Sequence, residues 1–446
     1  MSVLSRVLIC VAGAAAALPA QGPRKAFPYA YEQQDFSNGL RLITIPTDYP
    51  NVVSLFIVVQ TGSRNEVEPG KSGFAHLFEH MMFRGTPAFP PAKYEATLKA
   101  AGAASNAYTT DDHTAYHTTF SKEDLEIVVR MEADRFEHLE YSPEVFRTET
   151  LAVLGEYNKN SANPLMKLFE ELRNTAFDRH TYKHTTMGFL RDIEDMPNQF
   201  EYSRAFFDRY YRPEYTTLVI AGDVTPETAR ALVEKYWGAW KRGNYRPEIP
   251  TEPAQKGART KHVQWPTPTL PWVSVSFRGP RYSDEEKDQG ALDLIAFLGF
   301  AESSELYRRL VIEEQKVDTL RAGIADHVDP YLFTAFARVK KESDVDSVQE
   351  AMLATAAGFK EQLVPAARLE AVKRHVRYQF TLGLDNSEAI AGTVARYVAL
   401  RRTPETINRL YAVYDSITPE DIRAVARKYF TDDSRTIVTL AGGKSK

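Results

Sequence analysis

Short apolar runs recur at matching places in the two halves of the chain, and they predict strands. Val53–Val59 and Val273–Phe277 both read as alternating strands with the period of two that a sheet imposes. Arg209–Gly222 and Tyr429–Gly442 each read as the aromatic end of a helix, a short loop and a β-branched strand that closes on Ala-Gly. Two matches of this kind favour a duplicated domain over a chance likeness between strands.

The predicted helix starts support the same division. Each half has a Thr-Pro pair, Thr225-Pro226 and Thr418-Pro419, in which threonine is the N-cap and proline takes the first helical position. Strands precede the main helices in both halves, and this segregation is typical of the α+β class. We therefore expect an α+β protein made of two duplicated α/β-sandwich-like domains of similar fold.

Composition divides the chain into four segments. Residues 1–20 have a basic Arg6, an apolar run and a small Ala20, which together read as a secretory signal peptide. The run is shorter than the roughly 18 residues of a spanning helix, so an uncleaved anchor is the weaker alternative. We expect an N-terminal domain at 29–245, a Pro- and charge-rich linker at 246–260 and a C-terminal domain at 261–446.

The overall composition excludes some classes of partner. The 446-residue chain is 43% hydrophobic and 26% charged, which is typical of a globular protein. Its 55 basic and 59 acidic residues give a net charge of −4, so we expect no nucleic-acid surface and no polybasic membrane patch.

The only cysteine, Cys10, lies in the signal segment, so the mature chain would have no disulfide and no thiolate ligand. We expect export to the periplasm or another extracytoplasmic space, with no transmembrane segment after the signal.

Candidate chemistry is concentrated in Gly73–Gly85, which reads as a helix. His76 and His80 are four residues apart, so a helix places both on one face, where their ring nitrogens can reach one ion. Glu79 lies on the same side but offset, within reach of a water on that ion without being a ligand. A catalytic zinc has three protein ligands and an open fourth position, so a third ligand must come from elsewhere.

A later helical segment supplies a candidate for the third ligand. Glu149 and Glu156 are seven residues apart, two helical turns along one face, and Glu156 is the candidate. His-x-x-Glu-His is the inverzincin order, the reverse of His-Glu-x-x-His. A structural histidine or a solvated glutamate is the alternative for each residue alone, but the set favours a metal site.

Two other histidine pairs have the same spacing of four residues, but neither has an acidic residue in a suitable register. These pairs are His113/His117 and His180/His184. We interpret them as surface or packing histidines.

The metal motif resembles that of the pitrilysin-type (inverzincin) zinc metallopeptidases, especially the two-domain branch that includes mitochondrial processing peptidase and its bacterial relatives. All four motif positions match. Residues 102–116 are similar to the family's substrate-side edge strand, 180–188 to its following loop, and 298–310 to the opening helix of its second domain. The resemblance covers nearly all of the mature chain.

The resemblance implies a zinc-dependent endopeptidase that hydrolyses peptide bonds in extended or unfolded peptides. It implies that His76, His80 and Glu156 hold one zinc ion per chain and that Glu79 is the general base. Glu149 would not bind the zinc itself but would orient one of its ligands or tune the local charge. The same ligand set suits manganese or cobalt, so the sequence leaves the metal open, with zinc as the first expectation.

The resemblance also implies a half of a clamshell that a homologous second subunit completes. Asn106, Ala107 and Tyr108 would line the strand edge that receives the peptide substrate. Many family members carry an Arg, then a Tyr seven residues later, after the opening helix of the second domain. Those positions are Val311 and Asp318 here. Either a zinc-less paralogue supplies the pair in a heterodimer, or the chain forms a homodimer with substitute residues.

Two non-catalytic functions compete with the peptidase. One is an assembly or scaffold subunit that shares the fold, and the other is a receptor that only binds peptides. The complete motif argues against the scaffold, and Glu79 argues against the receptor, because binding alone needs no general base.

Overall fold

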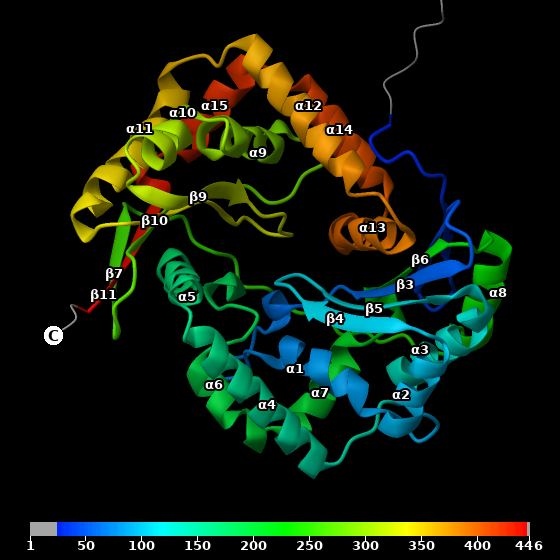
Figure 1. Cartoon of the computed structure of the whole chain (residues 1–446). Helices are drawn as coiled ribbons and strands as arrows, with labels where there is room; N and C mark the ends of the chain where they lie inside the picture. The colour runs from blue at the N-terminus through cyan, green and yellow to red at the C-terminus, as the bar shows by residue number, and fades with distance from the viewer. Residues whose placement is uncertain (1–24, 444–446) are drawn as a thin grey trace, which may run out of the picture.

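The computed structural model of the chain describes residues 25–443, so the expected signal segment and Cys10 lie outside the described residues. Two β-sheets with their helices form a mixed α/β structure shaped as half of a clamshell (Figure 1). The expected fold class is confirmed. Within 25–443, no helix has both the length and the apolar character needed to cross a bilayer.

The first sheet has six strands in the order β1-β2-β6-β3-β5-β4. Neighbouring strands are antiparallel except β2 and β6, which are parallel. Strand β4 is therefore an edge strand that pairs only with β5. The strands are β1 (Glu32–Asp35), β2 (Arg41–Pro46), β3 (Val52–Val59), β4 (Ala104–Thr109), β5 (Thr114–Ser121) and β6 (Thr216–Gly222).

The second sheet repeats this topology with five strands. Its order, β7-β11-β8-β10-β9, has one parallel pair, β7 with β11, at the place of β2 with β6. Strand β9 is the counterpart of β4 and is likewise an edge strand. The strands are β7 (Arg259–Trp265), β8 (Trp272–Arg278), β9 (Val317–Ile324), β10 (Leu332–Val339) and β11 (Arg435–Gly442). The matched order agrees with the duplication read from the sequence.

The repeated Ala-Gly ends of β6 and β11 have a steric cause. A Cβ atom at Gly222 would lie 2.2 Å from the carbonyl oxygen of Val52, and one at Gly442 would lie 2.4 Å from the amide nitrogen of Thr269. Both approaches are too close for any side chain. Each half therefore needs glycine where its last strand meets the neighbouring backbone.

Helices surround both sheets. Those of the first half are α1 (Phe74–Met81), α2 (Pro91–Ala100), α3 (Leu125–His138), α4 (Pro143–Ser161), α5 (Pro164–Ala176), α6 (Leu190–Asp195), α7 (Phe200–Tyr210) and α8 (Pro226–Trp237). Those of the second half are α9 (Lys287–Phe300), α10 (Glu305–Tyr307), α11 (Val345–Glu361), α12 (Ala366–Leu382), α13 (Ser387–Arg401), α14 (Glu405–Ser416) and α15 (Pro419–Tyr429). Thr225 and Thr418 cap α8 and α15 through their side chains, as predicted.

The segment 298–310, expected as one opening helix, is broken. Helix α9 ends at Phe300, the short α10 covers Glu305–Tyr307, and a π-helical turn follows over Arg308–Glu313. The side chain of Ser304 accepts a hydrogen bond from the amide of Tyr307 and so begins a new helix there. The expected single helix therefore spans the end of α9, α10 and the start of the π-helical turn.

Each sheet is covered on one face by a helix from the other half of the chain. Helix α13 packs on the first sheet, where its apolar side chains share a core with Phe56, Val58 and Val219. Helix α5 packs on the second sheet through Leu168 and Leu172. Figure 1 shows α13 beside β3 and β6, and α5 beside β7 and β11. This exchange fixes the position of one domain against the other.

The segment between α8 and β7 has no regular element but is hydrogen-bonded to the rest of the structure at several points, Glu252 among them. Both carboxylate oxygens of Glu252 accept backbone hydrogen bonds, from the amides of Asp178, Arg179 and His180. The expected exposed linker is thus anchored to the first domain.

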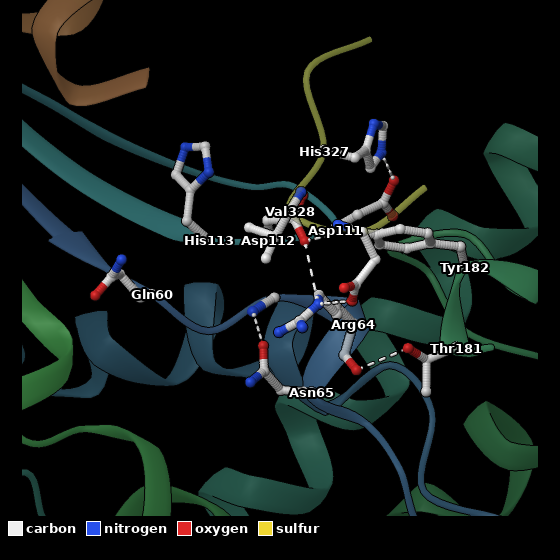
Figure 2. Close-up of polar contacts among 12 residues, drawn as sticks. Gln60, Arg64, Asn65, Asp111, Asp112, His113, Thr181, Tyr182, His327 and Val328 are labelled. Atoms are coloured by element: carbon white, nitrogen blue, oxygen red, sulfur yellow. Dashed lines mark hydrogen bonds and ion pairs between the residues drawn. The ribbon is translucent and has the colours of Figure 1, made fainter. Parts of the chain in front are cut away.

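A buried polar network also joins the domains (Figure 2). Asp111 accepts hydrogen bonds from Arg173 at 2.6 Å and from Ser63 at 2.9 Å, and it lies 2.8 Å from Nε2 of His327. Asp112 accepts from the Tyr182 hydroxyl at 2.6 Å and from the amide of Val328 at 3.1 Å. His327 and Val328 belong to the turn between β9 and β10, so this network holds the second sheet's edge hairpin against the first domain.

Three of the four histidines expected as surface or packing residues are buried: His113, His180 and His184. His180 also lies 3.0 Å from Asp329 of the second domain, an acidic partner distant in sequence. The packing interpretation holds for these three, and the surface alternative is wrong for them.

The network predicts a pH-dependent contribution to stability from His327. Burial lowers the pKa of His327, but Asp111 and Asp112 outweigh it, so the pKa lies above its usual value. A raised pKa means that the charged histidine stabilises the fold below about pH 6.5 and that this contribution is lost as the pH rises through the folded-state pKa. We expect His327→Gln to lower the free energy of unfolding by about 1–3 kcal/mol at pH 6, and by less at pH 9.

Urea unfolding at the two pH values measures this difference. The same substitution at the exposed His375 is the matched control and should change little at either pH. A loss for His327→Gln that is equal at pH 6 and pH 9 would show that charge on His327 does not contribute.

Candidate functional site

The position of α1 is set by a buried carboxylate at its start. Glu66 accepts hydrogen bonds from the amide of Gly73 at 2.8 Å and from that of Ala75 at 2.7 Å. Helices leave these first amides without partners, and a carboxylate there also interacts favourably with the helix dipole. Gly73 has φ of 95°, which glycine adopts readily, and a Cβ there would lie 2.8 Å from the carbonyl oxygen of Met187.

Three side chains with metal-binding atoms meet between α1 and α4. Nε2 of His76 and Nε2 of His80 each lie 3.6 Å from Oε2 of Glu156. One ligand atom from each of the three residues lies within 4.8 Å of the other two. Ligands of one tetrahedral zinc stand about 3.4 Å apart, given bonds of about 2.1 Å. Too long for hydrogen bonds, these separations suit atoms arranged around one ion.

The pKa values of the two histidines are shifted in opposite directions. Burial and the neighbouring His80 lower the pKa of His76 to about 4. His76 is therefore neutral near pH 7, and neutral imidazole is the form that binds metal. The carboxylates of Glu149 and Glu156 raise the pKa of His80, although burial opposes this. A concentration of negative charge around His80 favours a cation at this site.

Glu149 lies behind His80 rather than among the three converging groups. Its Oε2 is 3.7 Å from Nδ1 of His80, the ring nitrogen that does not point toward Glu156. Its Oε1 is 3.1 Å from Nε of Arg84. Glu149 is buried, so its carboxylate lies beside this ring nitrogen away from solvent.

Glu79 stands beside the group, one residue before His80. Oε2 of Glu79 accepts a hydrogen bond from the Thr109 hydroxyl at 2.7 Å. Burial raises the pKa of Glu79, although this hydrogen bond opposes the effect. A residue of β4 thus holds the Glu79 carboxylate in place. The raised pKa brings Glu79 closer to neutral pH, where a general acid or base is most effective.

The group opens into a cavity of about 910 Å³ between the two domains. One wall carries His76, Glu79 and Glu156, and the β4 residues Tyr108 and Thr109. The opposite wall comes from β9, β10 and the turn between them. The motif residues all belong to the first domain, but the second domain forms the opposite wall of the cavity.

The three expected substrate contacts differ in placement. All lie on the edge strand β4, whose outer side has no partner strand within the described chain. Tyr108 lines the cavity, but Ala107 is buried in the first domain's core and Asn106 is exposed outside the cavity lining. The side chain of Asn106 accepts a hydrogen bond from the amide of Ala107.

Val311 and Asp318 stand where many family members carry Arg and Tyr, and neither lines the cavity. Val311 packs against the apolar core of the second domain, and Asp318 lies 2.8 Å from Nε of Arg338. Arg321, three residues after Asp318 on β9, does line the cavity.

The sequence did not reveal several residues of the site. Thr109 and Arg84 have no motif of their own, and their contacts with Glu79 and Glu149 depend on how β4 and α4 pack around α1. Met166 and Phe169 of α5 line the cavity because α5 crosses to the other sheet. Met166 is a hydrophobic residue with an exposed side chain, but exposure is not visible in a sequence, so no sequence signal indicated this surface.

Two protein-family models match the chain. Residues 41–189 match the insulinase family, peptidase family M16, and residues 199–376 match the peptidase M16 inactive domain. The zinc protease PqqE of Helicobacter pylori is 27% identical over 444 residues, covering 98% of this chain and 97% of that protein. The mitochondrial-processing peptidase subunit beta of Blastocladiella emersonii is 22% identical and covers 90% of this chain and 87% of its own length.

Solved structures show the same fold. A protease from Helicobacter pylori, 27% identical, matches with a TM-score of 0.86 over 93% of this chain and 99% of that one. The periplasmic protease PqqL of Escherichia coli, 19% identical, matches with a TM-score of 0.73 over 96% of this chain but only 48% of its own length. One chain of this size thus corresponds to half of that molecule. The resemblance read from the sequence is confirmed, and the chain belongs to the insulinase family of peptidases, family M16, with both the N-terminal and the C-terminal domain of that family.

Proposed function

We propose that this chain is a zinc-dependent endopeptidase that hydrolyses extended or unfolded peptides. The observation that carries the proposal is the convergence of His76, His80 and Glu156 on one point, with Glu79 beside them. Without a metal, there is no evident reason for two imidazoles and a carboxylate to point at one another at distances too long for hydrogen bonds. The zinc proteases among the relatives support zinc over other divalent metals.

His76, His80 and Glu156 would hold one zinc ion through two nitrogens and one oxygen, which fits the ligand set of a catalytic zinc. When bound, zinc supplies Lewis-acid chemistry, polarising the scissile carbonyl and making water nucleophilic near neutral pH. Glu79 takes the proton from the attacking water and passes it to the leaving amine nitrogen. Thr109 holds one oxygen of Glu79 in place for both transfers.

The edge strand β4 offers a place for the substrate backbone. Its outer side has no partner strand within residues 25–443, and an extended peptide can add there as a further strand. Because Thr109 at the end of β4 contacts Glu79, a peptide along this edge, with Asn106, Ala107 and Tyr108 beside it, would pass the general base. A peptide segment that is already paired within a folded protein is not free to add in this way.

We propose that the chain works as one half of a dimer. It spans about half of PqqL, and its cavity lies on the inner side of a half clamshell. The partner is either a second copy or a zinc-less paralogue that supplies the Arg and Tyr absent at Val311 and Asp318. A non-catalytic scaffold is the second candidate, and the geometry of Glu79 argues against it.

Export and domain limits complete the proposal. PqqL is described as periplasmic, and the sequence of residues 1–20 reads as a signal peptide. We assign the catalytic domain to 29–245, the linker to 246–260 and the peptidase-like C-terminal domain to 261–446.

Replacement of the proposed base tests the chemistry. We expect Glu79→Gln to lower kcat for an unfolded peptide by about 10²–10⁴-fold, because the amide cannot accept the proton. Zinc content should stay at one per chain, because Glu79 is not a ligand. Peptide cleavage followed by mass spectrometry, with metal analysis of the same samples, measures both.

The matched control is Glu144→Gln, the same change at an exposed position of α4. It should retain full activity. Unchanged cleavage by Glu79→Gln would remove Glu79 from the mechanism, and a zinc-free wild-type protein would leave the scaffold as the better account.

Replacement of the carboxylate behind His80 tests the metal centre separately. We expect Glu149→Gln to lower zinc affinity by about 10–100-fold, because the His80 ring loses the partner that orients it. Competition with a chromophoric chelator measures the affinity, with Glu144→Gln again as control. Equal affinities for all three proteins would show that Glu149 has no such role.

Mixing experiments test the dimer. If the purified chain is the zinc subunit of a heterodimer, adding a zinc-less paralogue should raise its cleavage rate strongly. If it is a homodimer, sedimentation should show two copies and the added subunit should change nothing. A fully active monomer would contradict both arrangements.

A further inference from the structure

Most charged side chains around the active-site cavity already have protein partners. Glu170 of α5 lies 2.9 Å from Nζ of Lys167, and Arg173 lies 2.6 Å from Asp111. The two carboxylates on the wall formed by the first domain belong to the proposed catalytic centre. Charges paired in this way add little to the selection of a substrate.

Arg321 is different. It is an exposed residue of β9, it lines the cavity, and within residues 25–443 its side chain forms no ion pair and no hydrogen bond. The acidic residue nearest in sequence, Asp318, is engaged by Arg338 at 2.8 Å. Glu302 lines the adjacent smaller cavity together with Arg321 but is not within ion-pairing distance. The wall opposite the catalytic group thus presents a positive charge without a counter-ion.

The surroundings favour a carboxylate as the missing counter-ion. The apolar side chains of Met166, Phe169 and Phe336 form part of the same cavity lining as Arg321. A guanidinium presents donors in a planar fork that matches a carboxylate. Strand β9 is an edge strand, so a chain lying in the cavity can approach Arg321 directly.

We propose that Arg321 is a specificity-determining residue that binds a carboxylate of the peptide substrate while the scissile bond lies at the catalytic group. The carboxylate belongs either to an aspartate or glutamate side chain at a fixed distance from the cleaved bond or to the peptide's C-terminus. This inference rests on the proposed peptidase function and adds the substrate class that the site prefers.

Synthetic peptides with one backbone sequence and a single variable charge test the inference. One set moves a glutamate, a glutamine or a lysine through each position, with the C-terminus amidated. A second set is neutral throughout and ends in either an acid or an amide. Each set is cleaved by the wild type, Arg321→Gln and Arg321→Glu, and by Arg374→Glu, a charge reversal at an exposed position of α12 outside the cavity lining.

We expect wild-type kcat/KM to be about ten- to a hundredfold higher for glutamate than for glutamine at one position, or for the acid than for the amide. Arg321→Gln should abolish this preference, and Arg321→Glu should transfer it to lysine at the same position. The neutral, amidated peptide should be cleaved equally by all four proteins. The first set identifies a side chain as the source of the carboxylate, and the second set identifies the C-terminus.

Two results would overturn the inference. A charge preference that survives in Arg321→Glu, or none in the wild type, would exclude Arg321 while leaving the peptidase intact, because the neutral peptide would still be cleaved. If the wild type cleaves no peptide either alone or with an added zinc-less paralogue, the proposed function itself fails, and the inference fails with it.

Discussion

The structure depends on one packing constraint: each sheet has two apolar faces, and its own half of the chain leaves one of them uncovered. Phe56, Val58 and Val219 point away from the helices of the first half and would be exposed without α13. Leu332, Val438 and Leu440 depend in the same way on α5. The hydrophobic effect therefore drives each half to donate a helix to the other, at about 25 cal/mol for each Å² of apolar surface removed from water.

The functional site follows from that exchange. Because α5 must reach the second sheet, the β9–β10 hairpin comes to lie opposite α1 and α4, and the space between becomes the cavity. The buried network around Asp111 then holds the hairpin turn at His327 and Val328. The first domain supplies the groups that converge on one point, and the second supplies the wall that restricts what reaches them.

The local part of this arrangement could be predicted from the sequence. His76, Glu79 and His80 belong to one helix, so a period of 3.6 residues fixes their relative positions. The Ala-Gly ends of β6 and β11 were visible because backbone crowding permits only glycine there. Contacts between distant segments were not visible. Thr109 meets Glu79 across a strand–helix junction, and the partner of His180 lies in the other domain. The run Val53–Val59 was interpreted as an alternating strand, yet its nearly unbroken apolar character is typical of a strand covered on both faces, which is what the structure shows.

The central claim is that one zinc ion lies between α1 and α4. Diffraction from crystals of the zinc-loaded chain, measured on both sides of the zinc absorption edge, tests it most directly. The account predicts one anomalous peak per chain, bonded to Nε2 of His76, Nε2 of His80 and a carboxylate oxygen of Glu156, with Glu79 near but not bonded. A peak held by other residues, or none between these helices, would contradict it.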